Sequence, residues 1–313
     1  MSAQQRARTL PKRVLESIRR LPLWTPGDSV LVSVSGGLDS TVLLHLLAEL
    51  QPAHKAVLEV ATVDHGLRPE AAAEAQAVQE AARRLGLVCH VIELGLSPGP
   101  NLGLRARQAR RDALMALGHT RIATGHHQDD QAETVLQHLL RGAGMTGLSG
   151  MRPLAEPFCR PLLAEPRAVL LAWAEAQGLG WVEDPSNATS QRGEIRRLMP
   201  ELDALHGGAV ATLARSARLL AQEDALLSGL ADSAWSAVAR GAGLDRSALA
   251  AQHPAIQLRL LRRLIASVPA RVGADPLEAV VAGALMHSGR LDLAEGWALV
   301  CQDGVLVVVS PQG

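Results

Sequence analysis

The sequence contains no tyrosine and a single phenylalanine, Phe158, so it offers few aromatic platforms on which nucleic-acid bases could stack. Lysine is also scarce, because only Lys12 and Lys55 stand among 31 basic residues. The formal net charge is zero, which argues against a nonspecific polyanion binder. Almost all positive charge is therefore arginine, which suits two-pronged contacts with phosphate.

Cysteine is rare, and Cys89, Cys159 and Cys301 are isolated from one another. Three lone cysteines exclude a disulfide framework and a Cys-x-x-Cys metal site. Apolar stretches stay well short of a membrane span, and the mean hydropathy is only +0.11. The first twenty residues scatter arginines and lack the apolar core of a secretory signal. We therefore expect a cytoplasmic protein without a membrane segment.

The 313 residues exceed one ordinary domain, and the first half alternates short β-branched runs with longer amphipathic stretches. Such alternation predicts an α/β fold with a doubly wound parallel sheet and ligands at the carboxyl ends of its strands. The expected strands are 30–34, 57–63, 88–94, 121–124 and, more weakly, 181–183. The expected helices are 41–50, 70–85, 104–117 and 167–177, with a further helix that follows Gly125 and continues through Leu140. Residues 141–166 are expected to form a loop rich in Gly and Pro.

The pattern changes after Pro200. Residues 210–238 and 254–265 carry helical periodicity, and the apolar runs 297–302 and 305–309 flank an Asp-Gly pair, which is a hairpin signature. We expect a catalytic domain over residues 1–203 and a smaller, mainly helical domain over 204–313 that ends in a β-hairpin.

The clearest motif is a six-residue loop between the first strand and the first helix of the sheet. It consists of Ser35, Gly36, Gly37, Leu38, Asp39 and Ser40. Two glycines allow a sharp turn and a close approach to a ligand, and the following helix aims unpaired N–H groups at an anion. A Walker loop is excluded because no lysine is present. The alternative is a tight turn with Ser or Asp as helix cap, and the loop's position favours a nucleotide site.

A weaker motif, Asp64-His65-Gly66-Leu67-Arg68, ends the second strand, where a capped turn and a ligand site are equally compatible with the sequence. A stronger one begins at Gly125 and enters a helix. There Asp129, Asp130 and Glu133 are spaced to share one face. On an exposed face these acids would be ordinary acidic bias at a helix start, since each pair would repel by under ~1 kcal/mol and the helix dipole would offset it. The strand end favours a cleft, where at an effective dielectric near 20 each pair would repel by ~3 kcal/mol. A cation must then be present: Mg²⁺, an arginine or an ammonium substrate.

Three further segments complete the pattern. Arg107, Arg110 and Arg111 share a helical face, which on its own is typical of a solvated basic surface. Residues 141–151 hold four glycines before Arg160-Pro161-Leu162-Leu163. The run from Trp181 to Asn187 is followed by Arg192 and by Ile195-Arg196.

The loop at residues 35–40 resembles the pyrophosphate loop of the N-type ATP pyrophosphatases. Taken in order over residues 28–200, the motifs together resemble the tRNA(Ile)-lysidine synthetase family in its short form. Two positions depart from the family pattern. Gly193 follows Arg192 where the family usually has Asn, and Arg111 stands where it tends to have Tyr.

The resemblance implies a ligase that uses ATP and Mg²⁺ to adenylate the C2 carbonyl of the wobble cytidine in an isoleucine tRNA with a CAU anticodon. The ε-amine of L-lysine then replaces AMP, giving lysidine. By resemblance, Asp39 holds the metal, Asp130 is the base, Glu133 and Asp129 recognise lysine, and Arg110 contributes to the same site. The implied ATP contacts are the loop residues 35–40 with His65 and Gly125. The family includes dimers, so a homodimer is one open assembly state.

Arg192 and Arg196 are implied tRNA contacts. A third group, Arg259, Arg262 and Arg263, lies at i, i+3 and i+4 of the helix predicted over 254–265. We expect either a phosphate-binding stripe for tRNA or a solvated helix face.

Three other functions compete with lysidine synthesis. A tRNA-thiolating enzyme, such as a 2-thiocytidine synthetase, would need paired cysteines or an iron–sulfur cluster, which three separated cysteines disfavour. An amidating ligase would need an ammonia-supplying module, for which the remaining residues leave no room. A nucleotide sensor would bind ATP without releasing pyrophosphate.

Overall fold

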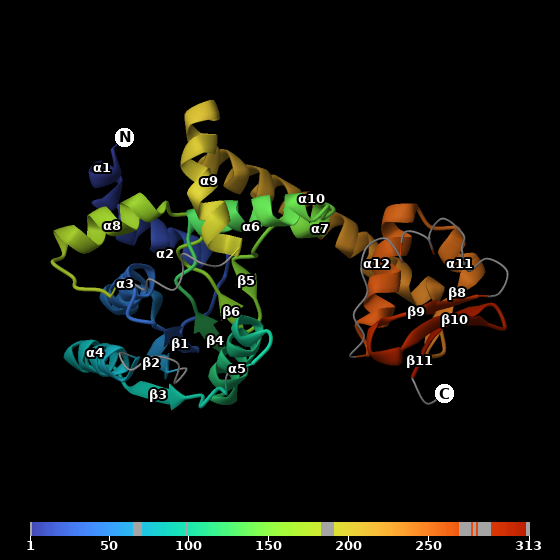
Figure 1. Cartoon of the computed structure of the whole chain (residues 1–313), viewed down its shortest axis with the longest axis horizontal. Coiled ribbons are helices and arrows are strands. Elements are labelled where there is room, and N and C mark those ends of the chain that lie inside the picture. The colour runs from blue at the N-terminus through green and yellow to red at the C-terminus, as the bar shows by residue number, and fades with distance from the viewer. Residues whose placement is uncertain are drawn as a thin grey trace. The chain divides into compact units, whose positions relative to one another are not determined.

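The computed structural model describes residues 2–64, 71–97, 99–182, 191–268, 277, 280 and 289–310. The chain forms two compact units (Figure 1), here called the N-terminal unit (residues 1–142 and 147–218) and the C-terminal unit (143–146 and 219–313). The sequence placed the division at 203/204, which falls within helix α9 (Gln191–His206). The units divide instead inside α10 (Ala209–Val238), because this 30-residue helix contributes to both.

The N-terminal unit contains a six-stranded sheet of order β3-β2-β1-β4-β6-β5. All pairs are parallel except β5–β6. The strands are β1 (Ser29–Ser33), β2 (Val57–Asp64), β3 (Cys89–Glu93), β4 (Arg121–Ala123), β5 (Leu154–Ala155) and β6 (Phe158–Cys159). The helices are α1 (Ala3–Ala7), α2 (Leu10–Arg20), α3 (Leu38–His54), α4 (Ala71–Arg84), α5 (Leu102–Ala116), α6 (Gln128–Leu140), α8 (Arg167–Ala176) and α9, while the residues of α7 (Met145–Leu148) are divided between the two units. The predicted parallel α/β sheet is confirmed.

Two local expectations were wrong. The segment 141–166 is not all loop, since β5 and β6 extend the sheet and α7 forms a single turn. Strands of two residues are too short to show a period, so only pairing with β4 reveals them. Trp181 and Val182 lie in no strand, although the Val182 N–H donates to the Gly36 carbonyl at 2.9 Å; Glu183 lies outside the described residues.

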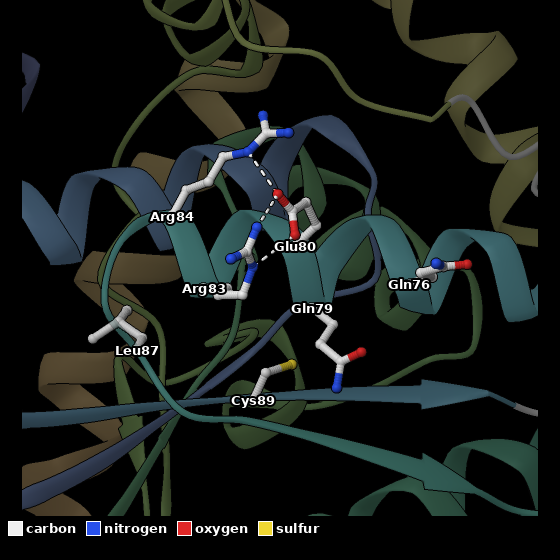
Figure 2. Close-up of a pocket in the computed structure, with 7 residues that line it drawn as sticks. All are labelled: Gln76, Gln79, Glu80, Arg83, Arg84, Leu87 and Cys89. Atoms are coloured by element: carbon white, nitrogen blue, oxygen red, sulfur yellow. Dashed lines mark hydrogen bonds and ion pairs between the residues drawn. The ribbon is translucent and has the colours of Figure 1, made fainter.

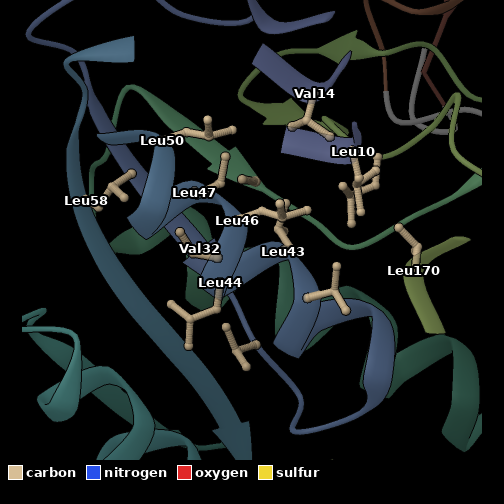
Figure 3. Close-up of a cluster of buried hydrophobic side chains, with 14 of the residues drawn as sticks. Leu10, Val14, Val32, Leu43, Leu44, Leu46, Leu47, Leu50, Leu58 and Leu170 are labelled. Atoms are coloured by element: carbon tan, nitrogen blue, oxygen red, sulfur yellow. The ribbon is translucent and has the colours of Figure 1, made fainter. Parts of the chain in front are cut away.

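Helices cover both faces of this sheet. On one face α2, α3 and α8 bury a leucine-rich cluster against β1 and β2 (Figure 3), which includes Leu10, Leu43, Leu46, Leu47, Leu58 and Leu170. On the other face Leu114 of α5 packs with Leu31, Ile122 and Phe158. Burying one such side chain contributes about 1.5–3 kcal/mol. The two layers hold β1 rigidly, so the loop that follows it starts from a fixed point.

The C-terminal unit contains α11 (Arg246–Ala250), α12 (Pro254–Ile265) and a five-stranded antiparallel sheet of order β7-β8-β11-β10-β9. Its strands are β7 (Ala239–Arg240), β8 (Gly243–Asp245), β9 (Arg290–Asp292), β10 (Ala298–Gln302) and β11 (Val305–Val309). The predicted hairpin is confirmed as β10–β11, with positive φ at Asp303 and Gly304. It is part of a larger sheet than the sequence indicated, because β7, β8 and β9 have only two or three residues each. No helix in the described parts of the chain is long and apolar enough to cross a membrane.

Two arginines of α12 pair with acids of α10, and the pairs differ in burial. Arg259 Nη2 donates to Asp224 Oδ1 at 2.8 Å, and Asp224 is 1% exposed and also accepts from Thr146. Arg263 Nη1 donates to Asp232 Oδ1 at 2.7 Å, and Asp232 is 71% exposed. A buried carboxylate with charged partners is costly to alter, whereas an exposed pair contributes little.

We expect Asp224→Asn to lower the free energy of unfolding by about 2 kcal/mol, because hydrogen bonds to charged groups contribute about 1.5–3 kcal/mol each. Asp232→Asn is the matched control on the same helix, with an expected effect within about 0.5 kcal/mol. Urea unfolding of the full chain measures both. Equal effects would contradict the assignment of Asp224 as the buried anchor.

Candidate active site

The loop between β1 and α3 is shaped by its own hydrogen bonds. Gly36 has φ +81°, a value that a side chain would strain, and Gly37 caps α3. The Ser40 hydroxyl donates to the Gly37 carbonyl at 3.0 Å and accepts from the Ser35 N–H at 3.1 Å. These contacts fold the loop over the start of α3, where helical N–H groups favour an anion. The nucleotide loop expected from the sequence is thus preorganised.

Gly125, at the end of β4, lies against this loop. A Cβ added at Gly125 would be 3.0 Å from backbone atoms of Asp39 and Ser40, so a larger residue would press against the first turn of α3. Glycine is therefore required here by close approach. The contact brings the loop and the start of α6 to the same edge of the sheet, as the strand order predicts.

His127 connects the two motifs. Its side chain is 2% exposed, and Nε2 lies 3.4 Å from both Asp39 Oδ2 and Asp130 Oδ2. Nδ1 lies 3.7 Å from Asp129 Oδ2. His127 also caps α6, and its own N–H donates to Asp130 Oδ2 at 3.0 Å. His127 therefore has both a structural role, as the cap of α6, and a place among the carboxylates of the site.

Charge within this group is balanced by His127. Burial works to lower the pKa of His127, but the hydrogen bond with Asp39 and the charges of Asp130 and Asp39 outweigh it, so the pKa lies above its ordinary value. Burial likewise works to raise the pKa of Asp39. The hydrogen bond and charge of His127, with Arg167 farther away, hold the pKa of Asp39 below its usual range. Asp39 is therefore a carboxylate at neutral pH.

Asp39 also has coordination capacity to spare. Its Oδ1 is buried without a hydrogen-bond partner among the described residues, and its nearest cation is Arg167 Nε at 3.8 Å. An orphaned carboxylate oxygen beside an anion-binding loop fits a divalent cation such as Mg²⁺, which prefers one or two carboxylates together with phosphate oxygens.

The carboxylates of α6 meet two arginines from α9. Glu133 is 2% exposed, and its oxygens accept from Arg192 Nε and Arg196 Nε, each at 2.7 Å. Arg192 Nη2 also donates to Asp130 Oδ1 at 2.8 Å. Asp129 Oδ2 accepts from the Arg167 N–H at 2.8 Å. The sequence required Mg²⁺, an arginine or an ammonium substrate beside these acids, and the structure supplies arginine. Arg192 and Arg196, which the resemblance implies as tRNA contacts, here contact protein carboxylates.

A second group of arginines surrounds His126. Burial lowers the pKa of His126 to about 3, and nearby positive charges add to the effect. Those charges belong to Arg160, Arg192, Arg110 and Arg107. Burial also lowers the pKa of Arg110, whose Nε is buried without a hydrogen-bond partner among the described residues. This excess of buried positive charge beside Gly125 suits an anionic ligand.

The remaining predicted positions are placed as follows. His65 lies outside the described residues. Arg111 stacks on Phe158, with its guanidinium carbon 4.0 Å from the ring centre, which gives this departure from the family pattern a packing role. Arg259 is 12% exposed and paired with Asp224, and Arg263 lies over Trp235 at 4.1 Å. Arg259, Arg262 and Arg263 thus do not form one open basic stripe.

The sequence missed Arg167 and Arg160 as neighbours of the site. Arg167 begins α8, far along the chain from the loop, and its sequence context carries no distinguishing pattern. Arg160 follows the unpredicted β6.

A pocket elsewhere on the unit (Figure 2) is lined by α4 and β3 residues, including Glu80, Arg83 and Cys89. Hydrogen bonds from Arg83 and Arg84 lower the pKa of Glu80 to about 2, and none of the lining residues belongs to the loop or to α6.

Comparison with known proteins agrees with this geometry. Residues 7–202 match the PP-loop domain model. Over 327 aligned residues the chain is 42% identical to tRNA(Ile)-lysidine synthase of Methylobacterium nodulans, with 95% of each chain covered. The chain belongs to the tRNA(Ile)-lysidine synthase family. The enzyme of the same name from Methylobacterium sp. (strain 4-46) is 38% identical, with 89% of this chain and 93% of the relative covered.

Family members differ in length. The tRNA(Ile)-lysidine synthase of Alkalilimnicola ehrlichii is 42% identical over 255 residues, which are 78% of this chain but 57% of the relative. Among solved structures, the U34-tRNA thiolase NcsA from Methanococcus maripaludis with its [4Fe-4S] cluster has a TM-score of 0.56 at 21% identity. That match covers 68% of this chain and 80% of the thiolase, and it supports the fold alone.

Proposed function

We propose that this lysidine synthase adenylates the C2 carbonyl of the wobble cytidine in tRNA(Ile) bearing a CAU anticodon, and then joins L-lysine at C2 through its ε-amine. The observation that carries the proposal is the meeting of Asp39 from the loop with Asp130 from α6 around the buried His127. The nucleotide loop and the carboxylates of α6 lie at the carboxyl ends of neighbouring strands, β1 and β4. Together they provide for adenylation and for the reaction with the amine.

In the first half-reaction the loop holds the pyrophosphate portion of ATP. Main-chain N–H groups at the start of α3 face the phosphates, and the Ser35 and Ser40 hydroxyls lie 3.2 Å apart beside them. Asp39, kept ionised by His127, would hold Mg²⁺ through its orphaned oxygen. The bound cation would neutralise the leaving pyrophosphate. Arg110 and its neighbours add positive charge on the Gly125 side.

In the second half-reaction the amine must lose a proton. An ammonium of pKa ~10.4 is neutral at pH 7 about once in 2,500, which corresponds to ~4.6 kcal/mol. A carboxylate beside the amine can bind the cation and accept its proton. We propose Asp130 as the base, with Glu133 and Asp129 recognising lysine.

The two arginines of α9 bear directly on that assignment. An ammonium that reaches Glu133 must share or replace a guanidinium contact, because both carboxylate oxygens already accept hydrogen bonds. Arg196 is the more exposed partner, at 49% against 33% for Arg192. We propose that lysine competes with Arg196 and leaves Arg192 in place on Asp130 and Glu133.

The thiolase alternative finds little support in the cysteines. Burial raises the pKa of Cys159 to about 12, so this thiol stays protonated at neutral pH. Cys89 lies on β3, and four strand spacings of about 4.8 Å separate β3 from the β6 strand of Cys159. The two are too far apart to share a disulfide or an iron–sulfur cluster.

The experiment that tests the function is incubation of the full chain with labelled lysine, ATP and total tRNA. We expect label in a single isoleucine tRNA, with one AMP and one pyrophosphate released per lysine incorporated. ATP binding without pyrophosphate release would indicate a nucleotide sensor. Pyrophosphate release without lysine incorporation would indicate another PP-loop tRNA-modifying activity, and either outcome would refute the proposal.

The structure changes the choice of arginines for testing tRNA binding. Arg259 is paired with the buried Asp224, whereas Arg263 is paired with the exposed Asp232. Arg262 and Arg263 are therefore the members of the α12 group that phosphate can reach. We expect Arg262→Gln with Arg263→Gln to reduce the salt dependence of tRNA binding by about one to two units, equally for every tRNA. Filter binding across a salt series measures this, with Arg240→Gln, which pairs with Asp245, as control. An unchanged slope would show that α12 is only a solvated surface.

A homodimer and a cytoplasmic location stay predictions.

A further inference from the structure

Three polar side chains gather on the sheet away from the loop and α6. Glu59 comes from β2, His90 from β3 and His119 from the turn before β4. One ligand atom from each lies within 4.8 Å of the other two. His90 Nε2 is 2.6 Å and His119 Nε2 is 3.6 Å from the same oxygen, Glu59 Oε2.

The group lies at the opposite edge of the sheet from the nucleotide loop. Glu59 and His90 stand near the amino ends of β2 and β3, and His119 precedes β4, whereas the loop follows the carboxyl end of β1. The β2–β3 register pairs Ala61 with His90. Since side chains alternate along a strand, Glu59, Ala61 and His90 share the face that α5 covers. No residue of the proposed catalytic group takes part.

His119 has the least satisfied side chain of the three. It is 9% exposed, and its Nδ1 is buried without a hydrogen-bond partner among the described residues. Its Nε2, at 3.6 Å, is beyond hydrogen-bonding distance from Glu59. A nearly buried imidazole aimed at a carboxylate without bonding to it is unfavourable, unless a cation lies between them.

We propose that Glu59, His90 and His119 form a binding site for a divalent transition metal, with zinc as the best match. Two imidazoles and one carboxylate are ligands that Zn²⁺ accepts, and a water completes four-coordination in sites with three protein ligands. Glu59 and His90 are 31% and 34% exposed, so solvent reaches the open position. Ca²⁺ and Mg²⁺ are poor matches because both prefer oxygen.

Two of the three separations between ligand atoms are close to those of a zinc site. Metal–ligand distances of 2.0–2.2 Å imply about 3.3 Å between tetrahedral ligand atoms. The observed separations of 2.6 and 3.6 Å from Glu59 Oε2 lie on either side of that value. Zinc would replace the hydrogen bond between His90 Nε2 and Glu59 Oε2, and Nε2 of both imidazoles would be a metal donor. The metal would join β2, β3 and the turn before β4.

Cys89 is not a ligand, although it precedes His90. Adjacent residues of a strand face opposite sides of the sheet, and Cys89 lines the pocket beneath α4 (Figure 2). The donor set is therefore two nitrogens and one oxygen. This predicts weaker binding than a thiolate site would show.

Calorimetric titration of the chelator-treated full chain with zinc tests the proposal. We expect one zinc per chain with a dissociation constant below roughly 1 µM, and a rise of several degrees in the unfolding midpoint at about 100 times that concentration. His90→Asn combined with His119→Gln should weaken binding by more than about 100-fold. His206→Gln, an exposed histidine of α9, should change nothing.

A second arm separates this site from the catalytic carboxylates. Asp39→Asn should keep the tight zinc site, because it alters the other edge of the sheet. If the double histidine variant folds and still binds one zinc with unchanged affinity, or if Asp39→Asn abolishes binding, the proposal is wrong. Should the double variant fail to fold, Glu59→Gln alone must lower the affinity at least tenfold. Wild-type protein that binds no zinc at 10 µM also refutes the proposal.

Discussion

Asp39→Asn is expected to lower the rate of ATP–pyrophosphate exchange by a factor of ~10²–10³ while the protein stays folded. Removing one electrostatic stabiliser of a developing charge has an effect of this size. The substitution keeps the shape of the side chain and its partner His127, but it removes the charge that His127 and Arg167 hold in place. It also weakens Oδ1, which is buried without a hydrogen-bond partner among the described residues.

The matched control is Asp112→Asn, an exposed carboxylate on α5 that accepts a hydrogen bond from Gln108 at 2.8 Å. Exchange in the control should equal that of the wild type. The free energy of unfolding of both variants should lie within about 1 kcal/mol of the wild-type value. A loss of activity would then not be explained by unfolding. A wild-type rate of ATP–pyrophosphate exchange in Asp39→Asn would contradict the assignment of Asp39 to the metal and pyrophosphate site.

Glu133→Gln is expected to stop lysine transfer, or to raise the lysine concentration it requires, while pyrophosphate release persists. Adenylation does not need lysine, whereas the amine needs a carboxylate that binds its charge. Single-turnover reactions with labelled ATP and labelled lysine separate the two half-reactions. If Glu133→Gln abolishes ATP binding, the α6 acids form a metal site and the lysine assignment is wrong.

The arginine contacts complicate that variant, and a second variant resolves the difficulty. Glu133 joins α6 to α9 through Arg192 and Arg196, so the amide also leaves two guanidiniums without their carboxylate. A general loosening of α9 would affect both half-reactions equally. Arg196→Gln frees one oxygen of Glu133 and keeps the carboxylate. Under the competition proposed above it should lower the lysine requirement, and an increase in that requirement would show that Arg196 assists lysine binding.

Much of the fold was predictable because its signals are local. Buried parallel strands are short β-branched runs, so the expected strands at 57–63 and 121–124 agree with β2 and β4 to within a residue. The hairpin was predictable because Asp303 and Gly304 can adopt positive φ. Two-residue strands have no such signature. The domain division also escaped prediction, because α10 continues through it without a break in its periodicity.

The sequence by itself predicted a nucleotide site, because a loop of two glycines and an acid between a strand and a helix places backbone N–H groups toward an anion. It also determined that α6 carries three acids on one side. Only the tertiary structure decided what neutralises them. Arg192 and Arg196 arrive from α9 about sixty residues away, and His127 becomes a bridge only when Gly125 brings β4 against the loop. Charge compensation depends on distances of 3–4 Å between segments remote in sequence, and no local pattern encodes those distances.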